Sequence, residues 1–219
     1  PQPLQVRVSM WREPEVRTGN HLARYRFESS KDKVLVLQEF KEKTHYCSSV
    51  VAATVVSEHI AVEKEGDTCR VIKVSPNQGK TTVLVASAVS WQPEKKPVRK
   101  ALRLLDRASR IGSERLRKEH AAWWASFWSR TFVHLTSADG VASFMEGVRC
   151  LHLYYMASSS RGMLPPKWNG SLFAVQGDER KWGSQFWVWT TESAYYPLYA
   201  ADAIDLTEPF FRLYVQQLP

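Results

Sequence analysis

The sequence has little cysteine and no long apolar run. It has 3 cysteines in 219 residues, and no apolar stretch approaches the roughly 18–20 residues that a membrane-spanning helix requires. We therefore expect no membrane insertion. The odd cysteine count and the lack of CxxC spacing predict no disulfide framework, although a Cys47–Cys69 bridge stays open for an exported chain. The chain begins at Pro1 and not at Met, and it ends at Pro219, so we expect a fragment of a longer protein. The lack of a signal-peptide core does not exclude an extracellular or periplasmic location, because a signal peptide could precede the fragment.

Several short catalytic motifs are also missing. The sequence contains no GxSxG, GxGxxG, GxxxxGK[ST] or HExxH, which argues against the usual acyl-transfer, nucleotide-binding and zinc-protease sites. His45, Cys47, His59 and Cys69 are too irregularly spaced for a structural zinc site, whose ligands come in close pairs. We expect no metal and no cofactor.

Basic residues are present in excess, but they are unevenly distributed. Residues 1–119 contain 23 Lys and Arg against 14 Asp and Glu, and Lys95–Lys118 alone contains 10 basic and 2 acidic residues. Aromatic residues are skewed the other way, with 20 of 26 in residues 120–219. Because single-stranded nucleic-acid sites interleave cations with aromatics, this segregation argues against a nucleic-acid partner. We interpret the basic block as the solvated face of a helix.

The first part of the chain is typical of strands. Short β-branched or alternating runs recur between residues 4 and 91, among them Val34–Leu37, Val71–Val74 and Thr82–Ala86. Turn-forming residues separate them, as at Glu65–Asp67 and Pro76–Gly79. We predict an antiparallel β-sandwich domain over 1–92, part of a larger sheet domain.

Two helices should follow over 93–130 as a basic linker. Apolar residues recur every three or four positions from Ala101 to Ile111, and Gly112 interrupts the pattern. A second stripe, His120 to Trp128, is aromatic and is interpreted as a packing face.

Further helices are predicted over 131–219. One begins after Ser137 or Asp139, either of which can cap it, and becomes apolar nearly all round towards Met156, so we expect it to be buried on both sides. His152 is interpreted there as a hydrogen-bonded core histidine. No helical period is visible over 162–189, which we read as one long ordered loop. Helix resumes near Glu192, with a break at Ile204 and a restart at Glu208.

This loop has the residue types of a sugar-binding site. Indole rings stack on the apolar faces of sugars, while amides and carboxylates pair with hydroxyls. The predicted substrate-binding residues are Trp168, Asn169, Trp182, Gln185, Trp187 and Trp189. The alternative is that these aromatic side chains pack in the interior of the protein and bind no ligand.

Three blocks carry a resemblance to a known superfamily. HAAWWASFWSR at His120–Arg130, SSSRGMLPPKWNG at Ser158–Gly170, and WGSQFW at Trp182–Trp187 followed by Tyr195–Pro197 resemble the start of the catalytic domain of six-hairpin glycosidases. The most similar groups are the inverting α-L-fucosidases and a sister group of uncharacterised bacterial proteins. The resemblance covers residues 119–214 and implies a β-sandwich, linker helices and the first helices of an incomplete (α/α)6 toroid.

The resemblance implies a secreted bacterial glycoside hydrolase of carbohydrate metabolism, whose substrate is a polysaccharide or glycan side chain. The two family asparagines that bind the sugar and position the attacking water fall here on Val188 and Thr190, which places that activity in doubt. In the family, the general acid lies on a later hairpin, so we expect this chain by itself to be inactive. Glu192 is a catalytic candidate. Its alternative role is structural, as an acidic residue at the start of a helix, where the helix dipole stabilises its charge. The alternative function is a non-catalytic carbohydrate-binding or scaffold protein with a degenerate glycosidase fold.

Overall fold

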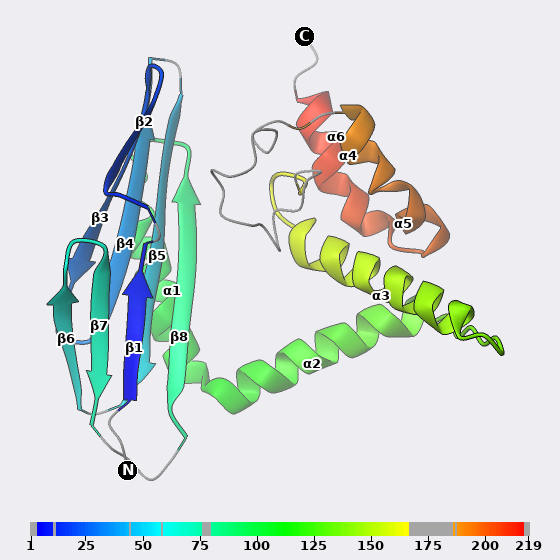
Figure 1. Cartoon of the computed structure of the whole chain (residues 1–219), viewed down its shortest axis with the longest axis horizontal. Coiled ribbons are helices and arrows are strands. Elements are labelled where there is room, and N and C mark those ends of the chain that lie inside the picture. Colours follow the sequence, from blue (N-terminus) through cyan, green and yellow to red (C-terminus); the bar gives the residue numbers. More distant parts are fainter. Residues whose placement is uncertain are drawn as a thin grey trace. The chain divides into compact units, whose positions relative to one another are not determined.

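The computed structural model describes residues 4–10, 12–43, 45–57, 59–75, 80–166, 186 and 188–216. The chain divides into two units, Pro1–His120 and Ala121–Pro219. The first unit contains antiparallel strands followed by a helix, and the second is helical in its described part (Figure 1). The predicted α+β class, with antiparallel sheet preceding helices, is therefore confirmed.

The described strands form two antiparallel sheets. They are β1 (Leu4–Ser9), β2 (Glu15–Thr18), β3 (His21–Ser29), β4 (Lys33–Lys41), β5 (Tyr46–Val56), β6 (Ile60–Glu65), β7 (Cys69–Val74) and β8 (Thr82–Ser90). One sheet has the order β1–β7–β6 and the other the order β2–β3–β4–β5–β8. Figure 1 shows the three-stranded sheet against one face of the five-stranded sheet, as predicted for a sandwich.

The apolar run Val34–Leu37 is buried on both faces of β4. Side chains alternate across a strand, so Val34 points towards the three-stranded sheet and packs in one cluster with Ile72, which is fully buried. Leu35 and Leu37 point the other way. A strand covered on both sides has no polar alternation, which is why this run is continuous.

Helix α1 (Val98–Ile111) covers the second face of the five-stranded sheet (Figure 1). Ala101 and Leu105 are buried against Leu35, Leu37, Val50, Ala52 and Ala88. The helix ends at Gly112, whose φ of 81° belongs to the left-handed region that favours glycine. Helix α2 (Ser113–Arg130) begins at the next residue, so the predicted interruption is confirmed.

The second unit contains α3 (Val141–Ser159), α4 (Val188–Ser193), α5 (Tyr196–Ala200), the 3-10 helix η2 (Ile204–Thr207) and α6 (Glu208–Val215). Gly140 is the N-cap residue of α3, and both predicted capping side chains, which precede it, accept hydrogen bonds from the first amides of the helix. Asp139 Oδ1 accepts a hydrogen bond from the Val141 amide at 3.0 Å, and Ser137 Oγ accepts one from the Ala142 amide at 3.0 Å. The predicted restart at Glu208 is also confirmed.

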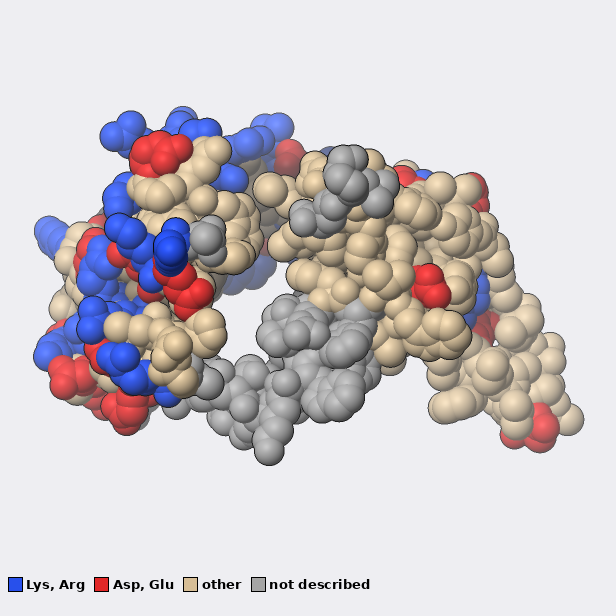
Figure 2. Space-filling model, turned by 90° about the horizontal axis from the view of Figure 1, so that it is seen from above, with Lys and Arg blue, Asp and Glu red and all other residues tan. Residues whose placement is uncertain are grey.

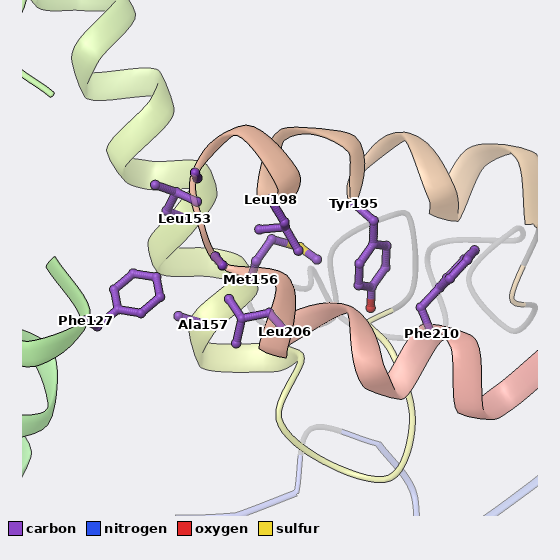
Figure 3. Packing of buried hydrophobic residues seen from close by; sticks show 10 residues of the cluster. Phe127, Leu153, Met156, Ala157, Tyr195, Leu198, Leu206 and Phe210 are labelled. Atoms are coloured by element: carbon purple, nitrogen blue, oxygen red, sulfur yellow. The ribbon is translucent and has the colours of Figure 1, made fainter. Parts of the chain in front are cut away.

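An apolar core joins these helices. Figure 3 shows the side chains of Met156, Leu198 and Leu206 lying together, and the ring centroids of Tyr195 and Phe210 are 4.8 Å apart. Phe127 of α2 is buried in the same cluster, with Trp123, Trp124 and Trp128 partly buried around it. The aromatic stripe of α2 is therefore a packing face, as predicted.

The expectation that α3 is buried on both sides is wrong within the described residues. Leu153, Met156 and Ala157 are buried, but large apolar side chains on the rest of the helix remain exposed: Val141, Phe144, Met145, Val148, Leu151 and Tyr154. The described helices α5, α6 and η2 contribute core residues that pack with Leu153, Met156 and Ala157. The composition of α3 shows how much of the helix is apolar, but it does not show which of its apolar side chains are covered by another element.

Cys47, Cys69 and Cys150 are free, so the alternative of a Cys47–Cys69 bridge is wrong. In the part of the chain that the structure describes, no helix is long and apolar enough to cross a membrane.

Candidate functional site

Most of the predicted sugar-binding residues lie outside the described residues: Trp168, Asn169, Trp182, Gln185 and Trp187. The structure describes the two segments that flank this stretch. On one side the chain leaves α3 and continues to Pro166, and on the other it enters α4 at Val188. The loop predicted over 162–189 therefore ends before Val188, because Val188 and Trp189 belong to α4.

Helix α4 presents three of the predicted residues to solvent. Trp189 is 83% exposed, and Val188 and Thr190 beside it are also exposed. Within the described residues Trp189 is the most exposed tryptophan, so its indole face is accessible to a ligand. An amide at positions 188 and 190 would be accessible in the same way, but valine cannot orient a water and threonine offers only a hydroxyl.

Glu192 lies on the same helix and is half-buried. It is the fifth of six residues in α4, so the interpretation of Glu192 as a helix-start residue is wrong. Its carboxylate accepts a hydrogen bond from the Tyr196 hydroxyl, which raises the pKa of Tyr196. Burial and then the charge of Glu192 raise the pKa of Tyr214, whose hydroxyl donates to the Phe186 carbonyl at 2.9 Å.

Four other described carboxylates of this unit have structural partners. Glu146 accepts the Leu135 amide at 2.8 Å, Asp205 pairs with Arg130 at 3.1 Å, and Glu208 pairs with Arg212. Asp139 caps α3. Among the carboxylates that the structure describes, Glu192 is the one that interacts with two tyrosines, and it can also accept hydrogen bonds from hydroxyls of a ligand.

A second feature lies between α3 and α5. An open groove of about 420 Å³ is lined mainly by apolar side chains of Met145, Val148, Leu153 and Pro197, together with His152. Burial lowers the pKa of His152, opposed by a hydrogen bond to the Ala194 backbone. The Nε2 atom is buried and has no hydrogen-bond partner. The prediction that His152 is a fully hydrogen-bonded core histidine is therefore wrong for one of its two nitrogens.

Sequence reasoning missed this groove. The signal that pointed to it was the apolar surface of α3, which extends over more than one side of the helix. Arg161, at the start of the predicted loop, was also missed as a contact residue. Its guanidinium lies over the Trp123 ring, 4.1 Å from the centroid, and so anchors this end of the loop on α2 by a cation–π contact.

These features describe a surface that can bind a polyhydroxylated ligand but do not describe a complete catalytic site. The described residues hold no cluster of three or more His, Cys, Asp or Glu side chains that suits a metal ion. Inverting hydrolysis needs a second carboxyl group about 6.5–9.5 Å from the first, with room for a water. Comparison of the chain with protein-family models, with curated proteins and with solved structures found no match.

Proposed function

We propose that this chain is part of a glycoside hydrolase of the six-hairpin, fucosidase-like type. The enzyme removes a side chain from a polysaccharide or glycan, outside the cell or in the periplasm, and uses no cofactor. In this proposal α3 to α6 are the first helices of an (α/α)6 barrel. The general acid and base come from further barrel helices, so the 219-residue chain by itself does not turn over substrate.

The order of the elements supports the proposal. An antiparallel sandwich precedes α2, which carries the motif at His120–Arg130, and the motif at Ser158–Gly170 begins in the last turn of α3. The third block ends in Tyr195–Pro197, at the start of α5. The observed succession of antiparallel sheets, a linker helix and further helices agrees with the order that the resemblance implies.

The observation that carries the proposal is the exposed indole of Trp189 on the same short helix as Glu192. An aromatic face stacks on the C–H face of a sugar, and a carboxylate accepts hydrogen bonds from its hydroxyls. Aromatic contacts contribute about 0.5–1.5 kcal/mol beyond area burial, which corresponds to roughly two- to tenfold in affinity.

The test is binding of neutral polysaccharides such as dextran, galactan and β-glucan to the full chain, measured by affinity electrophoresis and calorimetry. Trp189→Ala should weaken binding by about two- to tenfold. Trp91→Ala is the matched control, because Trp91 is 49% exposed but belongs to the first unit, and it should have no effect. If no neutral glycan binds, or if both variants bind as well as the parent, the proposed site is wrong.

The second candidate is a non-catalytic carbohydrate-binding or scaffold protein with a degenerate glycosidase fold. Val188 and Thr190 favour it, because these exposed side chains replace the two amides that position water in the fucosidases. The candidates differ in turnover. A polypeptide with the complete helical barrel hydrolyses aryl glycosides if the enzyme proposal is right, and binds glycans without hydrolysis if the second candidate is right.

A further inference from the structure

The outer face of α1 carries a stripe of cations. Arg99, Arg103, Arg107 and Arg110 are spaced three or four residues apart, with Lys100 beside them, and all five side chains are exposed. At about 100° per residue they lie within one third of the helix circumference, opposite the buried Ala101 and Leu105. The sheet therefore holds α1 so that the whole stripe faces solvent.

The members of this stripe lack acidic partners within the described residues. None of the ion pairs found there includes one of them. Arg103 and Arg110 each donate from Nε to a backbone carbonyl of their own helix, at 3.4 and 3.3 Å, which leaves the charge uncompensated. Like charges three or four residues apart on a helix repel one another, so the stripe lowers the stability of the free protein.

Helix α2 shows the ordinary arrangement for comparison. Arg115 pairs with Glu119 at 2.8 Å, and Arg117 pairs with Glu114 at 2.9 Å. Both helices are rich in arginine, but only the arginines of α2 form ion pairs with carboxylates one turn away. On α1, Asp106 lies one turn from Arg103 and Arg110 but forms no ion pair with either. The predicted solvated face is therefore present on α1 as well, but there its cations lack the ion pairs that α2 has.

The stripe continues into a hollow at the start of α1. This hollow, about 490 Å³ and open to solvent, is lined by Lys95, Lys96, Arg99, Lys100 and Arg103, with Glu94 as its one carboxylate. In the view of Figure 2, Lys and Arg side chains gather over the first unit, whereas the second unit is mostly tan.

We propose that the cationic face of α1, from Lys95 to Arg110, binds an anionic polysaccharide whose charges are carboxylates or sulfates. The proposal rests on the proposed function and narrows its substrate class. Four of the five stripe residues are arginines, whose planar guanidinium pairs with two oxygens of an anion at once. A linear polyanion can lie along the stripe, whose ends are eleven residues or about 16 Å apart.

Other polyanions fit this face less well. Single-stranded nucleic acids need aromatic stacking platforms, and α1 contains no Phe, Trp or Tyr. An amphipathic membrane-binding helix inserts its apolar face, but the apolar residues Ala101 and Leu105 of α1 are buried against the sheet. Charge alone does not distinguish a glycan from duplex DNA, so duplex DNA is included as a competitor in the test.

The test compares dextran with dextran sulfate, and adds polygalacturonate as the carboxylate-bearing probe. The full chain should bind both anionic polymers more tightly than dextran, and the difference should shrink as salt is raised, because binding releases counterions. Arg103→Gln with Arg107→Gln should weaken anionic binding by about five- to tenfold, because it removes two exposed charge contacts. The control is Arg115→Gln with Arg117→Gln, which removes the same charge from α2 and should change affinity less than twofold.

The outcomes separate this inference from the proposed function. Equal losses in the two double variants would show a response to net charge and overturn the inference, as would equal affinity for dextran and dextran sulfate. Tighter binding of a 20-base-pair DNA duplex than of either anionic polysaccharide would assign the face to nucleic acid instead. The proposed function is tested separately, by Trp189→Ala and neutral glycans, and it can fail while the α1 face still selects anionic polysaccharides.

Discussion

A buried hydrogen-bond chain ties α3 to α5 and η2, and its two hydroxyls should contribute unequally to stability. Ser160 Oγ lies 2.8 Å from the Tyr195 hydroxyl and donates to the Leu206 carbonyl at 2.8 Å. Ser160 is fully buried, and Tyr195 is 2% exposed. Because Ser160 Oγ donates to Leu206, Tyr195 donates to Ser160, and Ser160 is the central member of the chain.

Ser160→Ala should therefore destabilise the helical unit more than Tyr195→Phe. Removing Ser160 Oγ leaves both the Tyr195 hydroxyl and the Leu206 carbonyl buried without this partner, at a cost of about 1–3 kcal/mol. Removing the Tyr195 hydroxyl leaves the bond from Ser160 to Leu206 in place, so the cost is about 0.5–1.5 kcal/mol. The double variant should cost less than the sum, because the two groups share one bond.

The measurement is urea unfolding at pH 7, monitored by tryptophan fluorescence, since 7 of the 9 tryptophans lie in residues 121–219. Tyr196→Phe is the matched control, because Tyr196 is 60% exposed and its loss should change the free energy of unfolding by less than about 0.5 kcal/mol. If Tyr195→Phe costs as much as Ser160→Ala, or if the two substitutions are additive, Ser160 is not the central member and the reasoning is wrong.

Three further predictions concern stability and association. Burial raises the pKa of Tyr195 from 10.0 to about 12. The contribution of its neutral hydroxyl to the stability of the helical unit should therefore be complete below pH 10 and be lost as the pH rises through about 12. The urea midpoint of the parent should fall over this pH range by more than that of Tyr195→Phe. Leu105→Ala should destabilise the sheet unit by about 2–5 kcal/mol in thermal unfolding, whereas Leu104→Ala, at a position 40% exposed, should cost less than about 1 kcal/mol. Phe144 and Leu151 are 69% and 61% exposed on α3, so we expect this apolar surface to cause self-association of the chain in sedimentation experiments. Phe144→Ser with Leu151→Ser should reduce that association; a parent chain that stays monomeric, or an unchanged association state in the variant, would contradict a role for this surface.

Local sequence patterns determined the elements of this protein. The β-branched runs before residue 91, the apolar period from Ala101 to Ile111 and the glycine at 112 predicted strands, a helix and its end, and each lies where expected. The caps Ser137 and Asp139 were visible for the same reason. Such signals are local, because the alternation of a strand, the period of a helix and the geometry of a cap involve neighbours within a few residues.

The candidate site was predictable only in its residue types. Tryptophan and carboxylate near the predicted loop were visible in the sequence, but the exposure of Trp189 and the hydrogen bond between Glu192 and Tyr196 were not. The charge block at Lys95–Lys118 was visible as well. The ion pairs on α2 follow from local spacing, because the partners are three or four residues apart. That the arginines of α1 face solvent depends on the packing of Ala101 and Leu105 against the sheet.

Only the tertiary structure decided which surfaces meet. The sequence did not predict that β8 pairs with β5 across an intervening hairpin, or that α1 covers Leu35 and Leu37. It also did not predict which side of α3 is buried, since Leu153 and Phe144 are both apolar but only Leu153 of the two is buried. Hydrophobic burial is non-directional, so composition shows that a surface will be buried, and the partner that buries it is set by contacts between segments far apart in the chain.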